Sequence, residues 1–308
     1  MAKPRHVIEL KDFSKKEIED IIDLGIRLKK NSEKYSKSME NKTLAMLFQK
    51  TSTRTRLSFE AGMTRLGGHA IFVDSSTTQF DKAEIGDEAR CISRYADLIM
   101  MRPLKNSVLV KIAEASSVPV INGCCEKYHP CQALADMMTI KEHFGKFSGL
   151  NIVWLGIANN VSNSLMLAAT KLGAKFNLCV AEWDQDAIDP ELNKMVKGTG
   201  LFTESKDPKK AAKDADVLVT DTWVNMEKFN DPAFAAEKER RIKTFMPYQL
   251  NKKLIEGLNV KILHCLPAHY GYEVDDYVIN SKQSMAFDEA ENRMHAQNAL
   301  MLKLVGRA

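Results

Sequence analysis

Short apolar runs recur along this chain, and most of them are separated by segments whose apolar residues follow helical spacing. Short apolar runs are typical of buried strands, and longer periodic segments are typical of helices that cover a sheet. The predicted strands are 44–48, 70–73, 98–101, 118–121, 152–155, 178–180, 217–219 and 262–263. The predicted helices, besides one that begins after Ser14, are 83–95, 131–145, 161–172, 208–214 and 291–304.

Strands that alternate with helices predict parallel, doubly wound sheets. A chain of 308 residues is longer than one ordinary hydrophobic core supports, and the strands form two sets on either side of the helix at 131–145. We therefore expect an α/β protein with two doubly wound parallel-sheet domains of similar size, and a C-terminal helix that packs back on the first domain. The expected domains are 1–135, joined by the C-terminal segment 289–308, and 136–288.

Hydroxyl and guanidinium side chains alternate at one predicted helix start, soon after the strand at 44–48. The turn consists of Ser52, Thr53, Arg54 and Thr55. A helix start presents unpaired backbone N–H groups and a partial positive charge, and arginine adds planar donors suited to phosphate. A simple Ser52 cap beside solvated arginines would explain one hydroxyl but not the alternation, so the turn predicts a phosphate site.

Polar residues also follow other predicted strands, at the sheet edge where open α/β folds bind their ligands. They are Arg102, Asn122, Asn159, Asn160, Asp221, His264 and Cys265. Loops are polar in any such fold, but arginine, histidine and cysteine are less usual choices and favour a site. Taken one at a time, Cys265 could be a core thiol, His264 a core histidine and Asp221 a helix cap.

Composition excludes some classes of protein. The chain is 44% apolar and 27% charged with a net charge of +4, which is typical of a globular protein, and no basic stripe indicates nucleic acid as a partner. No apolar stretch is long enough to span a bilayer, and the first residues lack the apolar core of a secretory signal. The six cysteines show no metal-binding spacing, so we expect a reduced, cytoplasmic protein with no membrane partner. Cys91, Cys131 and Cys179 are expected in the core.

Two motifs of the first half resemble one enzyme family. Ser-Thr-Arg-Thr-Arg at 52–56, followed by Ser-Phe-Glu, and His-Pro-Cys-Gln at 129–132 are similar to carbamoyl-phosphate motifs of the aspartate/ornithine carbamoyltransferase superfamily. The resemblance implies that the phosphate is held by Ser52, Thr53, Arg54, Thr55 and Arg102. It also implies that the carbonyl group is polarised by His129, Arg102, Thr55 and Arg293. The carbamoyl NH₂ group would be held by Gln132 and the Leu266 carbonyl.

Motifs of the second half resemble the ornithine branch of the superfamily, so the resemblance covers essentially the whole chain. They are His-Cys-Leu-Pro at 264–267, Asp-Thr-Trp at 221–223, Asn-Asn at 159–160 and Asp-Glu-Ala-Glu-Asn-Arg at 288–293. The resemblance implies that Asp221 binds the α-ammonium group of an amino acid and Asn160 its α-carboxylate. Cys265, Asn225 and Met226 would complete this substrate site. The implied catalytic residues are Arg102, His129, Asp221, Cys265 and Arg293.

The chain departs from the ornithine branch at three places. It has Asn225-Met226-Glu227 where that branch has Ser-Met-Gly, Tyr270 where many members have arginine, and Glu126 where bacterial relatives often have asparagine. Two glutamates facing an α-carboxylate would repel it. L-Ornithine is the favoured amine substrate, and putrescine and lysine are the alternatives.

The resemblance implies a carbamoyltransferase that acts on carbamoyl phosphate and L-ornithine, forms L-citrulline and phosphate, and serves arginine metabolism. The first domain would bind carbamoyl phosphate and the second the amino acid. No cofactor or metal is expected, since arginines perform the electrophilic work. The family also implies a homotrimer, or a multiple of trimers, in which the loop around Gln79 reaches the neighbouring phosphate site. A non-catalytic paralogue that binds an anion is the alternative of a different class.

Overall fold

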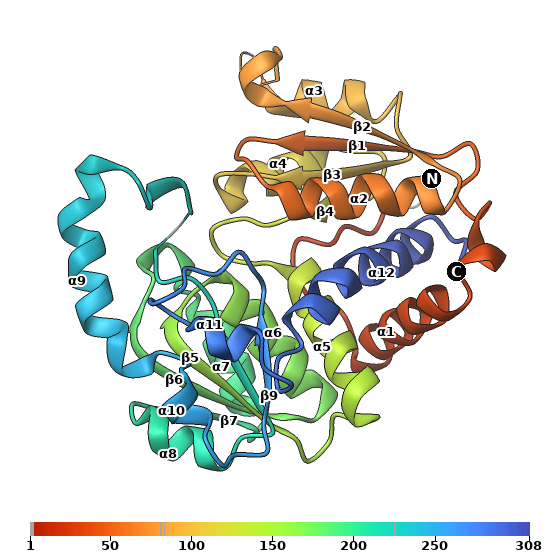
Figure 1. Cartoon of the computed structure of the whole chain (residues 1–308). Coiled ribbons are helices and arrows are strands. Elements are labelled where there is room, and N and C mark those ends of the chain that lie inside the picture. The colour runs from red at the N-terminus through yellow and green to blue at the C-terminus, as the bar shows by residue number, and fades with distance from the viewer. Residues whose placement is uncertain (1–2, 81, 83, 225) are drawn as a thin grey trace.

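The computed structural model describes residues 3–80, 82, 84–224 and 226–308. Within these residues the chain forms two parallel sheets, upper and lower in Figure 1, with helices around and between them. The sheets have four and five strands, in the orders β2-β1-β3-β4 and β7-β6-β5-β8-β9. The predicted fold of two doubly wound parallel sheets is confirmed.

The first sheet is buried on both faces around β1 (Thr43–Phe48). Leu44 and Met46 belong to the large core shared with α1 and α5, whereas Ala45 and Leu47 pack on the opposite side. Because successive side chains of a strand point to opposite faces, a continuous apolar run is what a doubly covered sheet requires. The other elements of this half are β2 (His69–Asp74), α2 (Thr53–Arg65), α3 (Ile85–Ile92), β3 (Leu98–Arg102), α4 (Asn106–Ala115) and β4 (Val120–Asn122).

The second sheet is organised in the same way around β5 (Asn151–Ala158), whose residues Trp154 and Leu155 enter different cores. Its other strands are β6 (Lys175–Trp183), β7 (Phe202–Ser205), β8 (Val217–Thr220) and β9 (Lys261–His264). The accompanying helices are α6 (Asn160–Leu172), α7 (Pro190–Gly198), α8 (Pro208–Lys213), α9 (Ala235–Phe245), α10 (Lys252–Ile255) and α11 (Asp276–Ile279). Short 3-10 helices cover Ser32–Tyr35, Ser75–Thr77, Gln185–Ala187, Met226–Lys228, Pro232–Phe234 and Met246–Tyr248.

Three helices pack on one another between the sheets: α1 (Lys15–Lys30), α5 (Pro130–Phe144) and α12 (Ala286–Leu304) (Figure 1). The C-terminal helix α12 also contacts α2, so it packs back on the first half of the chain as predicted. Gly62 permits this close approach, because a Cβ atom there would lie 2.2 Å from Oδ1 of Asn298 on α12.

Some expectations needed correction. Helix α12 begins at Ala286 rather than 291, because its polar first turn masks the apolar spacing. Strand β7 was not predicted, since it is a half-exposed edge strand without an apolar run. The helices α4, α7, α9, α10 and α11 were not predicted either. Cys91 is exposed on α3, so its expected burial was wrong, whereas Cys131 and Cys179 are buried as predicted. None of the helices in the described part of the chain is long and apolar enough to cross a bilayer.

Candidate active site

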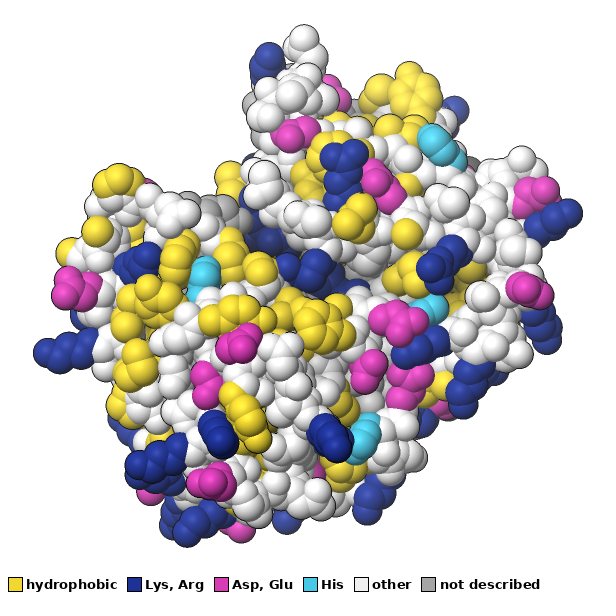
Figure 2. Space-filling view, in the orientation of Figure 1, with side chains coloured by type: hydrophobic (Ala, Val, Ile, Leu, Met, Phe, Trp, Pro, Cys, Tyr) yellow, Lys and Arg dark blue, Asp and Glu magenta, His cyan; other side chains and the backbone are white. Residues whose placement is uncertain are grey.

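A narrow cavity of about 130 Å³ lies between the two sheets, at the carboxyl ends of their strands. In Figure 2, Lys and Arg side chains are visible in the furrow between the upper and lower lobes. Most of the predicted site residues line the cavity: Ser52, Arg54, Thr55, Arg102, His129, Gln132, Asn160, Asp221, Met226, Cys265, Leu266 and Arg293. Residues of both halves of the chain, far apart in sequence, are therefore brought to one place.

Five wall residues were not predicted, namely Lys50, Cys124, Val161, Thr222 and Pro267. Each of them stands next to or close to a residue that the sequence singled out, so their neighbours were the available signal. Cys124 likewise stands two residues after Asn122, and it lies in a bend where its φ is +151°.

Five described residues that the sequence singled out do not line the cavity, namely Thr53, Gln79, Asn122, Asn159 and His264. Thr53 faces a neighbouring groove, and Gln79 is exposed. Asn122 is wholly buried. Its Nδ2 donates to the Ile8 carbonyl at 2.8 Å, and its Oδ1 accepts the Cys124 N–H at 2.9 Å. It therefore supports the bend at Cys124 from behind. Asn225 lies outside the described residues.

Helix α2 begins where the sequence predicted it, with Ser52 as its N-cap. The Ser52 Oγ accepts the Thr55 N–H at 3.3 Å, and its extended φ of −167° turns the chain into the helix. The other N–H groups of a first turn have no partner within the helix. Helices α5 and α6 also begin at this cavity, with Gln132 and Asn160 in their first turns. Three helix N-termini thus direct partial positive charge into one space.

Four cationic side chains, Lys50, Arg54, Arg102 and Arg293, share the cavity wall. The Nε of Arg54 is buried and has no hydrogen-bond partner among the described residues. Burial lowers the pKa of Arg54 from its usual value, and the neighbouring Arg102 lowers it further. A buried donor without a partner is costly, and this one is surrounded by excess positive charge. The arrangement is therefore suited to an anionic ligand.

His129 stands at the N-cap of α5, where its backbone N–H donates to Ser164 Oγ at 2.8 Å. Its Nδ1 is buried without a hydrogen-bond partner in the described part of the chain. Burial places the pKa of His129 well below its usual value, and the nearby cations Arg293, Arg102, Lys50 and Arg54 lower it further. The ring is therefore neutral at physiological pH and can serve as a hydrogen-bonding group toward a ligand.

Arg293 joins three helices at the cavity. It is buried, and its Nη1 donates to Gln132 Oε1 on α5 at 2.5 Å while its Nη2 lies 3.4 Å from Thr55 Oγ1 on α2. Arg293 is therefore not a surface residue of the last helix. A guanidinium held in this way is fixed in orientation before any ligand binds.

The other side of the cavity is built around the Asp221 carboxylate. Its Oδ1 accepts the Thr222 N–H at 2.8 Å and the Cys265 thiol at 3.0 Å, and its Oδ2 accepts Asn159 Nδ2 at 2.8 Å. Burial raises the pKa of Cys265 well above its usual value, and the Asp221 carboxylate raises it further. The thiol therefore stays protonated and donates to Asp221. Asn160 is held by a hydrogen bond to the Cys125 carbonyl at 2.6 Å.

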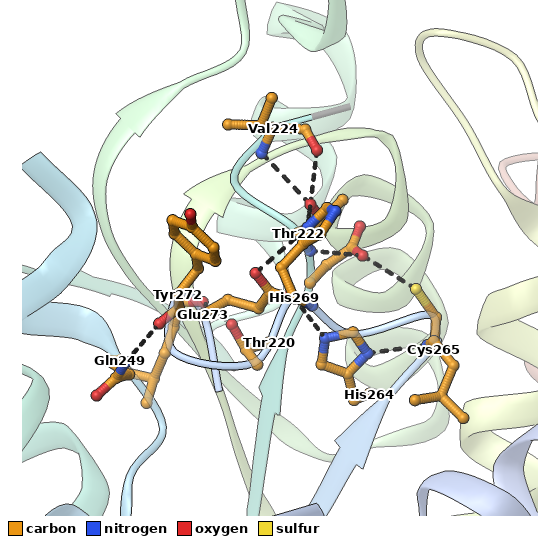
Figure 3. Close-up of polar contacts among 12 residues, drawn as sticks. Thr220, Thr222, Val224, Gln249, His264, Cys265, His269, Tyr272 and Glu273 are labelled. Atoms are coloured by element: carbon orange, nitrogen blue, oxygen red, sulfur yellow. Dashed lines mark hydrogen bonds and ion pairs between the residues drawn. The ribbon is translucent and has the colours of Figure 1, made fainter. Parts of the chain in front are cut away.

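Polar contacts behind the cavity join the loops that follow β8 and β9 (Figure 3). His264 is wholly buried; its Nδ1 accepts the Leu266 N–H at 2.8 Å, and its Nε2 lies 3.3 Å from Glu273 Oε1. The same oxygen accepts the His269 backbone N–H at 2.6 Å, and His269 Nδ1 lies 2.9 Å from Thr222 Oγ1. This network was not predicted, and it fixes the two loops relative to each other.

The structure revises one of the expected departures. Glu126 does not face the cavity, because its Oε2 accepts the Asn106 N–H at 2.6 Å and anchors the start of α4. Tyr270 is half exposed and also lies outside the cavity wall. The side chain of Glu227 lies outside the described part of the chain. One of the two carboxylates expected to repel an α-carboxylate is therefore engaged elsewhere.

Comparison with known proteins agrees with this geometry. The carbamoyl-phosphate-binding domain of aspartate/ornithine carbamoyltransferases matches residues 5–142, and the Asp/Orn-binding domain matches 148–304. The ornithine carbamoyltransferase of Archaeoglobus fulgidus is 42% identical over 310 residues, which is 98% of this chain and 98% of the relative. An anabolic ornithine carbamoyltransferase of Pyrococcus furiosus is 43% identical over 98% of this chain and 96% of its own.

The same relationship holds in three dimensions. A solved structure of ornithine carbamoyltransferase from Pyrococcus furiosus has a TM-score of 0.90 at 41% identity, covering 99% of this chain and 98% of that one. A second, from Thermus thermophilus, has a TM-score of 0.86 at 34% identity over 99% of this chain and all of that one. With both domains matched and the fold shared end to end, the chain belongs to the aspartate/ornithine carbamoyltransferase family.

Proposed function

We propose that this protein transfers the carbamoyl group of carbamoyl phosphate to the δ-amine of L-ornithine, forming L-citrulline and phosphate. The observation that carries the proposal is one cavity with two unlike sides. One side is cationic and holds Arg54 Nε and His129 Nδ1, which have no partner among the described residues, and the other is built around the Asp221 carboxylate. The first suits a phosphoryl group beside a carbonyl group, and the second suits an ammonium group. Relatives named ornithine carbamoyltransferase, similar over nearly the whole chain, support the same reaction.

For carbamoyl phosphate, we assign the phosphate to the α2 start and Arg102. The first-turn N–H groups, including that of Thr53, supply donors although the Thr53 side chain faces the neighbouring groove. His129, Arg293 and Thr55 donate toward the carbonyl oxygen, where negative charge grows as the tetrahedral intermediate forms. The Gln132 amide oxygen and the Leu266 carbonyl oxygen accept hydrogen bonds from the carbamoyl NH₂ group.

For the amino acid, we assign the α-ammonium group to Asp221 and the α-carboxylate to Asn160, with Cys265, Met226 and the Asn225 segment around the side chain.

The neutral δ-amine attacks the carbonyl carbon, forming the C–N bond as the π electrons move to oxygen. Collapse of the intermediate breaks the C–O bond, phosphate leaves with that electron pair, and the nitrogen loses a proton. Arginines and a histidine stabilise the charge, so the proposed reaction uses no metal or other cofactor.

The wider setting follows from this proposal. Residues 1–135, with the C-terminal segment 289–308, would form the carbamoyl-phosphate domain, and 136–288 the amino-acid domain. We place the enzyme in the cytoplasm and in arginine metabolism, in keeping with the anabolic name of one relative. Its partners would be the two small substrates and further copies of the same chain, with no nucleic acid or membrane.

A panel of amines tests the proposed reaction. Phosphate release and ureido product are measured with carbamoyl phosphate and L-ornithine, L-lysine or putrescine, with the Arg54→Ala protein as a blank. We expect kcat/KM for ornithine to exceed that for putrescine by at least about a hundredfold, because putrescine leaves the groups that bind an amino acid unpaired. Putrescine as the best substrate would contradict the assignment of ornithine. Absence of turnover with every amine would support the non-catalytic alternative.

We further propose that the active unit is a homotrimer whose phosphate sites are completed by a neighbouring subunit. Strand β2 is an edge strand with Ile71 43% exposed, and Leu57 on α2 is 58% exposed. Between these elements a groove of about 660 Å³ runs beside the phosphate turn, and Thr53 lines it. A second copy that inserts its Gln79 loop there would cover apolar surface and bring a donor to the phosphate.

Mixing two impaired variants tests the shared site. Arg54→Ala and Gln79→Ala are each expected to be impaired, but in a mixed trimer an intact Arg54 can face an intact Gln79 at one of the three sites, which is about a quarter of all sites in an equal random mixture. Activity of the refolded mixture should therefore rise well above the sum of its parts. The matched control is Arg54→Ala with Arg102→Ala, which both belong to the same side and should not complement. A protein that sediments as a monomer and is fully active would contradict the proposal.

A further inference from the structure

Two buried carboxyl groups stand against the side-chain amide of Gln132. Asp136, one helical turn further along α5, and Glu289 on α12 are each 1% exposed, as is Gln132 itself. Gln132 Nε2 donates to Asp136 Oδ1 at 2.8 Å and to Glu289 Oε1 at 2.7 Å. The second oxygen of Glu289 accepts the backbone N–H of His264 at 2.9 Å. Neither carboxyl group lines the cavity, and neither has a role in the proposed reaction.

The hydrogen bonds around Gln132 permit only one orientation of its amide. An NH₂ group has two hydrogens, and both are taken by carboxyl oxygens. The amide oxygen accepts from Arg293 Nη1 at 2.5 Å and keeps a second lone pair. A rotated amide would place its oxygen against two acceptors and its NH₂ group against a guanidinium. The oxygen is therefore held on the side of Arg293, which is a wall of the cavity.

Burial explains how two acidic groups can share this position. It raises the pKa of Asp136, and it raises the pKa of Glu289 well above its usual value, with the neighbouring Asp136 raising it further. The pair consequently retains a proton at neutral pH. Each carboxyl group still offers an oxygen lone pair to Gln132, so their effect on the amide does not need two negative charges.

We propose that Asp136 and Glu289 are positioning residues that hold the Gln132 amide oxygen toward the cavity, and that this orientation selects a ligand with an NH₂ group on its carbonyl carbon. The inference rests on the proposed function, because it concerns how carbamoyl phosphate is distinguished from acyl phosphates of similar shape. Acetyl phosphate, which has a methyl group in place of NH₂, would leave the Gln132 oxygen without a donor.

Two matched substitutions separate this role from simple structural support. In Glu289→Gln the side chain has one oxygen left, but two donors, the His264 backbone N–H and Gln132 Nε2, need an acceptor. Because β9 fixes the His264 N–H, the oxygen stays with that donor and the new NH₂ group faces the Gln132 amide. Asp136→Asn keeps one oxygen for its donor Gln132, and its NH₂ group can donate to Glu289. Both variants exchange a buried carboxyl group for an amide, but only the first is expected to disturb the orientation.

The measurement is the affinity of two stable probes of equal charge, phosphonoacetamide and 2-oxopropylphosphonate, which differ by NH₂ against CH₃. Wild type and Asp136→Asn should prefer the amide probe, and in Glu289→Gln this preference should fall by about tenfold. Equal loss in both variants, or preservation in both, would overturn the proposal while leaving the reaction intact. If wild type binds neither probe, the proposed function itself fails.

Folding of each variant is checked by thermal unfolding. If Glu289→Gln does not fold, Asp136→Leu replaces it, since leucine has a similar shape and removes one acceptor from Gln132. A preference for the amide probe that survives Asp136→Leu would contradict the positioning role, and a reduced preference would support it.

Discussion

Replacing Arg54 with alanine is expected to reduce kcat/KM for carbamoyl phosphate by about two to three orders of magnitude. Its guanidinium is directed into the cavity, and its Nε has no partner in the described part of the chain until an anion binds. A charge-assisted hydrogen bond to a phosphoryl oxygen is stronger than a neutral one, and its loss is felt where charge develops during the reaction. Inhibition by inorganic phosphate should weaken in parallel.

The same substitution should leave the fold intact. Because the buried Nε forms no hydrogen bond with any described residue and Arg102 is close, removal of Arg54 is expected to change the free energy of unfolding by less than about 1 kcal/mol. The matched control is Arg65→Ala, which removes an exposed arginine in the last turn of the same helix. Near-normal turnover by Arg54→Ala, or an equal loss in Arg65→Ala, would contradict the assignment of the phosphate site.

Between about pH 6 and pH 8, kcat/KM for L-ornithine should rise about tenfold per pH unit, because an aliphatic amine with a pKa of about 10.4 is almost wholly protonated there. The protein groups do not supply this dependence. The pKa of His129 is lowered, so its neutral form is already present throughout the range. The pKa of Cys265 is raised, so its thiol remains a donor throughout the range.

Initial rates across this pH range provide the measurement. A plateau that begins near pH 7 would indicate that a protein group with a pKa near that of free histidine controls the rate. That result would contradict the expectation that His129 is neutral throughout the range. The buried pair of Asp136 and Glu289 also has raised pKa values, so Asp136→Asn is the control. An unchanged slope in that variant is expected if the substrate amine is the titrating group.

Local features of the structure could be predicted from the sequence because their determinants are adjacent in the chain. The Ser52 cap and the first turn of α2 depend on residues within three positions of each other. Continuous apolar runs located most of the strands, since a sheet covered on both faces needs no polar alternation. Edge strand β7 was missed for the same reason, because it is half exposed. The position of a residue at the end of a strand was enough to nominate Arg102, Asp221 and Cys265.

Side-chain direction could not be predicted in this way. Thr53 belongs to the predicted turn, but the rotation of the helix directs its side chain to the neighbouring groove. Glu126 lies close to His129 in sequence, yet it anchors α4 by bonding the Asn106 N–H. His264 follows the predicted pattern of strand-end residues, but it supports the Leu266 backbone from behind the cavity. In each case a neighbour in space, rather than one in sequence, decides where the side chain points.

By itself, the sequence determined the α/β architecture and the helix starts that face the cavity, because periodicity, caps and strand ends are local properties. Its motifs, through their resemblance to one family, supplied most of the residues in the cavity wall. Only the tertiary structure decided how those residues are oriented. Gln132 and Glu289 are 157 positions apart and Gln132 and Arg293 are 161 apart, and they meet because α5 and α12 pack together. An amide is turned by the hydrogen-bonding groups around it, and those groups come together only when distant helices pack.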